Sequence, residues 1–124
     1  MAFALKIKRI YEAPAEDDGE RILVDRLWPR GIKKENACLD LWAKEITPTP
    51  ELRKWFGHKE ENFEEFRLAY RTELDGNAQA QEFASKVKAE LEKRNVTLLY
   101  AAKSPTCNHA VILKGWLEDT WSAK

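Results

Sequence analysis

The chain has 124 residues, of which 44% are hydrophobic and 34% are charged, so it can bury one hydrophobic core and is too apolar for a disordered tail. Its 21 basic residues balance its 21 acidic residues, and this net charge of zero does not favour nucleic acid or a membrane surface as a partner. The two cysteines, Cys38 and Cys107, lie too far apart for a zinc motif and are typical of reduced thiols. Charged residues interrupt the N-terminal segment where a signal peptide would be apolar, so we expect a cytoplasmic protein.

The N-terminal third of the chain predicts two strands. Residues 3 to 10 alternate apolar and polar side chains, as in a half-buried strand near the edge of a sheet. The polar stretch 12–20, "EAPAEDDGE", predicts an exposed loop. Residues 21 to 27 predict the second strand, and its consecutive apolar residues 22–24 indicate that both faces are covered. Residues 39 to 46 fit either a strand or a helix, and we favour a short strand.

The rest of the chain predicts helices and one further strand. Thr49 can cap a short helix that has Pro50 at its first position and ends at Gly57. Apolar residues at helical spacing predict a helix from about 60 to 75 and another from about 80 to 94. Residues 96 to 102 are apolar on both faces and predict a buried strand, and residues 109 to 121 predict the last helix.

Buried strands that alternate with amphipathic helices predict an α/β fold. We expect a single small domain over residues 1–124, with a mostly parallel sheet of about four strands flanked by helices. The strands at 21–27 and 96–102 should be interior and parallel to each other, because both are apolar on both faces and helices separate them in the sequence.

Polar residues follow both of these strands, at the end of a parallel sheet where ligands usually bind. The residues after strand 21–27 are Asp25, Arg26, Trp28 and Arg30, and those after strand 96–102 are Lys103, Asn108 and His109. The start of the last helix adds unpaired N–H groups and the positive end of a dipole, which favour an anion. We predict a pocket for a small anionic, phosphate- or nucleotide-like ligand. Its ligand-binding residues would be Arg26, Trp28, Arg30, Lys103 and Asn108, and its acid–base pair would be His109 and Asp25.

The same residues also have structural interpretations. An arginine after a strand is usually solvated or salt-bridged, and Asp25 is placed to orient Arg26 or Arg30. The tryptophans Trp28, Trp42 and Trp55 fit a core or a cavity wall better than a stacking platform. Familiar cofactor signatures (GxGxxG, GxxxxGK[ST], HExxH, GxSxG) do not occur in the sequence, so we predict neither a cofactor nor a metal ion.

Four segments resemble the YeaO-like family of bacterial proteins, which belongs to a larger class defined as a domain of unknown function. They are "RILVDRLWPRGIKKE", "WAKEITPTPELRKWFGH", "FEEFRLAYRTEL" and "VTLLYAAKSPTCNHAVILKGWL", and the resemblance runs from about residue 5 to residue 121. It implies a small cytoplasmic α/β protein. Wider relatives carry Cys-His-Arg where this chain has Asn108-His109-Ala110, so the resemblance implies that only the histidine is kept. Cys107 lies one position before the match, which argues against a role for its thiol.

Three functions remain open on the sequence. The first is an enzyme that acts on a small anionic substrate, with His109 and Asp25 as acid and base. The second is a non-catalytic module that senses an anionic metabolite. The third is an accessory nucleic-acid binder that uses residues 30–34, "RGIKK", but this basic run is too short to supply many phosphate contacts.

Overall fold

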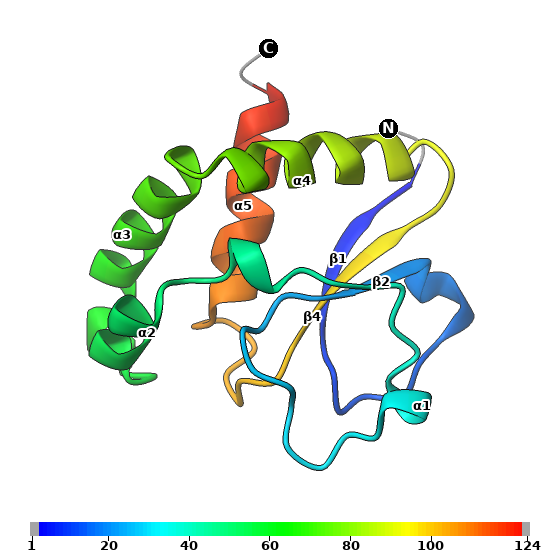
Figure 1. The fold of residues 1–124 in the computed structure, drawn as a ribbon, viewed down its shortest axis with the longest axis horizontal. Helices are drawn as coiled ribbons and strands as arrows, with labels where there is room; N and C mark the ends of the chain where they lie inside the picture. The colour runs from blue at the N-terminus through cyan, green and yellow to red at the C-terminus, as the bar shows by residue number, and fades with distance from the viewer. Residues whose placement is uncertain (1–2, 123–124) are drawn as a thin grey trace.

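The sheet is the part of the structure that positions the site. The computed structural model describes residues 3–122 and forms one sheet of four parallel strands in the order β1-β4-β2-β3 (Figure 1). The strands are β1 (Leu5–Arg9), β2 (Glu20–Leu23), β3 (Leu41–Trp42) and β4 (Val96–Tyr100). The prediction of an α/β fold with a parallel sheet is confirmed, as are the edge position of β1 and the interior positions of β2 and β4. Residues 1–2 and 123–124 of the expected domain lie outside the described residues.

Five helices accompany the sheet within residues 3–122: α1 (Lys34–Ala37), α2 (Pro50–Phe56), α3 (Phe63–Asp75), α4 (Ala78–Glu90) and α5 (His109–Ser122). The predicted limits of α2 are confirmed, because the Thr49 hydroxyl accepts a hydrogen bond from the Leu52 N–H and Gly57 ends the helix with φ 55°. Three short 3₁₀ helices lie at Glu16–Asp18, Lys44–Ile46 and Glu60–Asn62. Helix α1 was not predicted, since its four residues are too few to show an apolar period.

The two faces of the sheet are covered by different parts of the chain. Ile22 and Leu98 pack into the larger core cluster, which contains the buried residues of α3, α4 and α5. Leu23 and Leu99 point to the other face, where the loop residues Trp28 and Ile32 and the β3 residue Trp42 pack over them. Figure 1 shows α1 at a distance from α3, α4 and α5. Loop residues and the short helix α1, whose Ala37 carbonyl accepts hydrogen bonds from Arg21, therefore cover the second face.

All four strands are shorter in the structure than predicted, and the difference is largest for β2 and β3. Strand β2 was expected to reach residue 27 but ends at Leu23. The Val24 N–H still donates to the Leu99 carbonyl at 3.0 Å, but the next N–H of β4, that of Ala101, donates to the side chain of Asp25 at 3.0 Å. A carboxylate thus replaces the next carbonyl of the ladder. The expected strand at 39–46 is confined to Leu41–Trp42 and is followed by the 3₁₀ helix Lys44–Ile46.

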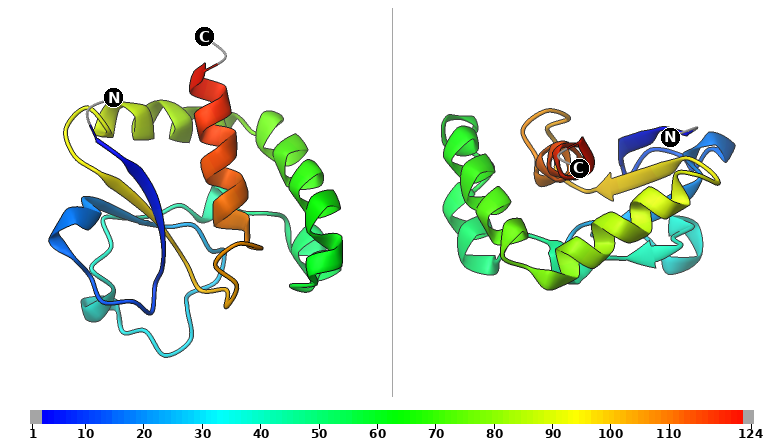
Figure 2. Two further views of the ribbon diagram at one scale, coloured as in Figure 1. Left: turned by 180° about the vertical axis from the view of Figure 1, so that it is seen from behind. Right: turned by 90° about the horizontal axis from the view of Figure 1, so that it is seen from above.

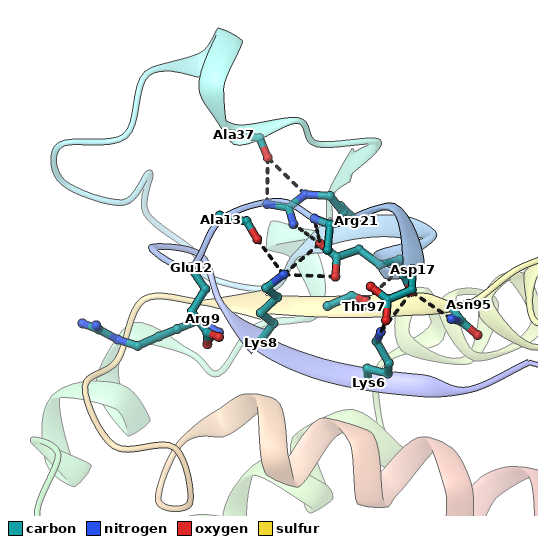
Figure 3. A network of polar contacts seen from close by, with 12 residues as sticks. Lys6, Lys8, Arg9, Glu12, Ala13, Asp17, Arg21, Ala37, Asn95 and Thr97 are labelled. Carbon is teal, nitrogen blue, oxygen red and sulfur yellow. Dashed lines mark hydrogen bonds and ion pairs between the residues drawn. The ribbon is translucent and has the colours of Figure 1, made fainter.

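The loop at residues 12–20 was expected to be exposed, and this prediction is wrong for Asp18 and for Glu20, which begins β2. The Asp18 side chain is buried and forms ion pairs with Lys8 from β1 and Arg21 from β2. Figure 3 shows these two basic side chains and the Ala37 carbonyl in the same polar network. Arg21 is also buried, and its guanidinium donates two further hydrogen bonds to the Ala37 carbonyl, at 3.0 and 3.3 Å. The Thr97 hydroxyl donates to the Asp18 carbonyl at 2.7 Å. Basic side chains on this face of the sheet hold the carboxylate inside.

Phe66 on α3 tests the packing of the helices on the sheet. Its ring is 1% exposed and stacks on the ring of Phe56, with centroids 4.1 Å apart. We expect Phe66→Ala to lower the free energy of unfolding by about 3 to 5 kcal/mol, measured by urea denaturation. Leu68→Ala on the same helix is the control, because Leu68 is 55% exposed and its loss should cost less than about 0.5 kcal/mol. A loss below about 1 kcal/mol for Phe66→Ala would contradict this packing.

The Asp18 network predicts a specific dependence of stability on pH. Burial alone would raise the pKa of Asp18, but hydrogen bonds from the Ala15 N–H, Lys8 and Arg21 outweigh it and hold that pKa below its ordinary value of 3.8. The carboxylate therefore stabilises the fold above the ordinary pKa, and the stabilisation is lost as the pH falls through the lowered one.

Asp18→Asn should cost about 3 to 5 kcal/mol at pH 7, because it leaves the buried Arg21 without its counter-charge. Urea denaturation between pH 7 and pH 2 should also show a smaller loss of stability below about pH 4 in the variant than in the wild type. Equal losses in both proteins would show that Asp18 does not supply this acid sensitivity.

Candidate functional site

A cavity of about 850 Å³ lies at the carboxyl ends of β2 and β4. The loops that leave these two strands run side by side beneath the start of α5, as two opposite views show (Figures 1 and 2). All seven residues that the sequence analysis selected line this cavity: Asp25, Arg26, Trp28, Arg30, Lys103, Asn108 and His109. Helix α2 supplies part of the remaining wall through Arg53 and Phe56. The parallel strand order brings the two loops together, because β2 and β4 are neighbours.

Asp25 joins the end of β2 to the end of β4 and to the start of α5. Its Oδ2 accepts a hydrogen bond from the Ala101 N–H at 3.0 Å, and its Oδ1 lies 2.8 Å from His109 Nε2. The Trp42 indole N–H donates to the Asp25 carbonyl at 2.7 Å. The prediction that Asp25 orients an arginine is wrong, since no arginine within residues 3–122 forms an ion pair with it. The carboxylate turns instead toward the backbone N–H that follows β4.

The imidazole of His109 is held through one nitrogen. Nε2 lies 2.7 Å from the Val24 carbonyl oxygen and 2.8 Å from the Asp25 carboxylate. Because both neighbours are acceptors, Nε2 carries a proton. Nδ1 makes no hydrogen bond with any residue that the structure describes, and the side chain, 17% exposed, lines the cavity. Nδ1 can therefore accept a proton when the ring is neutral, or donate a hydrogen bond to an anion when the ring is charged.

Arg26 is half-buried in the cavity wall and has no carboxylate partner among residues 3–122. Its Nε and Nη2 both point at the Pro48 carbonyl oxygen, each at a long 3.4 Å. Glu73 lines a second cavity of about 400 Å³ on which Arg26 also borders. Both oxygens of Glu73 are bound to Thr49, one by its N–H at 3.1 Å and one by its hydroxyl at 2.7 Å. Most of the hydrogen-bonding capacity of Arg26 therefore remains unused.

A buried tyrosine fixes the segment that holds Arg26. The Tyr70 hydroxyl donates to the Ile46 carbonyl at 2.7 Å, and the side chain is fully enclosed. Burial, reinforced by the negative charge of Glu73, raises the pKa of Tyr70, so the phenol stays neutral and keeps its proton for this bond. The bond anchors residues 46–48 and with them the carbonyl that faces Arg26.

The cavity carries an excess of positive charge. Among residues 3–122, four arginine and lysine side chains line it, those of Arg26, Arg30, Arg53 and Lys103, and Asp25 is the only acidic lining residue. None of these four forms an ion pair with a carboxylate in the described part of the chain. A wall of this composition creates a positive potential inside the cavity.

Comparison with known proteins assigns the chain to a family. The sequence model of the family described as "Inactive DUF488-N3 subclade" matches residues 4–124. The chain belongs to this family. It is 47% identical over 115 residues to "Uncharacterized protein YeaO" of Escherichia coli (strain K12), which covers 93% of this chain and 97% of the relative. The resemblance to the YeaO-like family is therefore confirmed.

Mycobacterial proteins also match most of the chain. "Uncharacterized protein Rv3073c" of Mycobacterium tuberculosis (strain H37Rv) is 37% identical over 113 residues, which make up 88% of this chain and 89% of the relative. "Uncharacterized protein Mb3100c" of Mycobacterium bovis matches to the same extent. No solved structure matches the chain.

In this member of the DUF488-N3 subclade, two of the predicted ligand-binding side chains have structural roles. Asn108 is 1% exposed; its Oδ1 accepts a hydrogen bond from the Val111 N–H at 3.0 Å, and its Nδ2 donates to the Ser104 carbonyl at 2.8 Å. The side chain thus caps α5, as its residue type indicated. The Trp28 indole donates to the Ile32 carbonyl at 2.7 Å and lies in the cavity wall.

Other lining residues were not predicted from the sequence. Arg53 and His58 approach the cavity from α2 and from the turn after it, and Tyr11 approaches from the loop after β1. Their periodicity and spacing gave no signal, because only the tertiary fold brings these elements to the ends of β2 and β4. Trp55 was expected in the core or in a cavity wall, but it is 48% exposed on α2 and the expectation is wrong.

Two further observations concern the described residues only. Histidine, cysteine and carboxylate side chains form no group of three or more within residues 3–122 that could hold a metal ion. Over the same residues, every helix is too short or too polar to cross a membrane.

Proposed function

We propose that this protein binds a small anion that carries a phosphate or a carboxylate group in the cavity between the loops after β2 and β4. The observation that carries this proposal is Arg26, a half-buried arginine on the cavity wall without a carboxylate partner among residues 3–122. Charged side chains are rarely withdrawn from water unless a counter-charge compensates them. A bound anion would supply that counter-charge.

Each positive group would contribute in its own way. The planar guanidinium of Arg26 can make a two-pronged contact with a phosphate or a carboxylate. The exposed side chains of Arg30 and Lys103 stand at the rim, where they would attract the anion and close over it. The first turn of α5 begins at His109, on the same wall, and adds the positive end of a helix dipole.

Binding without turnover is the form of this function that the residues support best. The resemblance implies that wider relatives carry a cysteine where this chain has Asn108. Both polar atoms of the Asn108 side chain are used within the fold, Oδ1 to cap α5 and Nδ2 to bind the Ser104 carbonyl in the loop before it. The description of the matched family model calls the subclade inactive. Both points favour a module that holds an anion over an enzyme that attacks it with a nucleophile.

An enzyme is the second candidate, and one observation favours it. The Val24 carbonyl holds His109 through Nε2, with the Asp25 carboxylate 2.8 Å from the same atom. Nδ1 has no partner among residues 3–122, and the side chain lines the cavity, an arrangement that suits a general base. Release of inorganic phosphate from a panel of phosphate monoesters separates the two candidates. The binding module releases none above the rate in buffer, whereas an enzyme releases phosphate and His109→Ala abolishes the release.

Arg26→Ala provides the direct test of binding. Isothermal titration of the wild type with inorganic phosphate at low salt should give saturable binding at one site. The variant should bind about 1.5 to 3 kcal/mol more weakly, roughly a tenfold to hundredfold increase in Kd, because a charge-assisted hydrogen bond is lost.

Two variants control this experiment. Arg67→Ala removes an arginine of α3 that does not line the cavity, so it controls for the loss of one positive charge. Cys107→Ser changes a lining residue by a single atom, and no basic side chain within residues 3–122 hydrogen-bonds its Sγ. Both should bind phosphate as the wild type does. Equal binding by Arg26→Ala and Arg67→Ala would contradict the proposed site.

A further inference from the structure

Tyr11 is an exposed aromatic residue that two contacts hold in place at the cavity. The ring is 44% exposed and lines the cavity wall. Its hydroxyl donates a hydrogen bond to the Arg30 carbonyl at 2.8 Å, and the guanidinium of Arg9 lies over the ring, 4.9 Å from its centroid. Arg9 is itself fixed, because its Nε donates to the Ala102 carbonyl at 2.8 Å and its Nη2 to the Ala101 carbonyl at 3.3 Å.

This arrangement leaves one face of the ring available to a ligand. Arg9 covers one face of Tyr11, so the exposed area belongs to the remaining face and the edge. A fixed tyrosine loses little conformational entropy when a partner packs on it. Flat aromatic groups, such as nucleobases, stack on rings of this kind without a strong sequence preference.

The Tyr11 ring and the positively charged side chains line the same cavity. The carbonyl of Arg30 anchors the Tyr11 hydroxyl, and the side chain of Arg30 lines the same cavity as Arg26 and Lys103. A volume of about 850 Å³ lies in the range of cavities that hold organic ligands and far exceeds the needs of a single phosphate group. The cavity therefore has room for a second part of a ligand beside its anionic group.

We propose that the anion is the phosphate of a nucleotide and that the nucleobase stacks on the open face of Tyr11. This inference rests on the proposed function, since the phosphate would be bound by Arg26 and Lys103. A free mononucleotide fits better than a nucleic acid strand. The positive side chains surround a cavity, the net charge of the chain is zero, and binding to a polynucleotide needs several phosphate contacts along one face.

Three probes test this inference by isothermal titration of the full chain: AMP, ribose 5-phosphate and inorganic phosphate. The wild type should bind AMP about tenfold or more tightly than ribose 5-phosphate, which has the phosphate and the sugar but no base. Tyr11→Leu keeps the bulk of the side chain but not the ring, and should reduce the two affinities to within about twofold of each other. Tyr11→Phe keeps the ring and should retain most of the preference for AMP.

The outcomes separate the two proposals. Equal affinity of the wild type for AMP and ribose 5-phosphate would overturn the stacking inference and leave the anion site intact. A preference for AMP that survives Tyr11→Leu would also overturn it, because the base would then lie elsewhere. A 5′-phosphorylated octanucleotide that binds far more tightly than AMP would assign the site to nucleic acid instead. Failure of all three small probes to bind would refute the anion site itself.

Discussion

The carboxylate of Asp25 connects the three segments from which the site is built. It receives the N–H of Ala101 at the end of β4 and approaches the imidazole of His109 at the start of α5, while its own backbone continues β2. Without a carboxylate at this position, the part-buried N–H of Ala101 after β4 would lose its acceptor, and Nε2 of His109 would keep only its contact with the Val24 carbonyl. Asp25 therefore fixes the spacing between the loops that enclose the cavity.

This use of Asp25 leaves the cavity short of negative charge. Two arginines on β2 and the loop after it show the contrast. Arg21 is buried with the Asp18 carboxylate against it and the Ala37 carbonyl beyond, so its guanidinium is compensated within the fold. Arg26 is also withdrawn from solvent, but within residues 3–122 it has only two long contacts to the Pro48 carbonyl. Arg21 therefore stabilises the fold, and we interpret Arg26 as a ligand-binding residue.

Part of this organisation could be read from the sequence. The apolar runs of β2 and β4 predicted two interior parallel strands, and the rule that parallel strands end at a common edge predicted where seven polar residues would gather. Capping residues predicted the limits of α2. These features depend on local residue types and on strand order. Both are visible in the sequence as apolar runs and as capping or turn residues.

The features that were not predicted depend on contacts between segments that lie far apart in the sequence, and such contacts leave no local sequence pattern. The end of β2 was misplaced because the side chain of Asp25, rather than a carbonyl, accepts the next hydrogen bond from β4. The loop before β2 was expected in solvent because acidic residues usually stay there, yet Lys8 and Arg21 draw Asp18 inside. Tyr11 and Arg53 were missed for the same reason, since each reaches the cavity only after the chain has folded.

The most direct test of the anion site is a ¹H–¹⁵N NMR titration of the protein with inorganic phosphate at low salt, with the Nε–H signal of Arg26 followed together with the backbone amides. The account predicts saturable shifts at one site, concentrated in the Arg26 Nε–H and in the amides of residues 25–31 and 101–110. Shifts that do not saturate, or that fall on surface arginines such as Arg67 and Arg94 rather than on these loops, would contradict it.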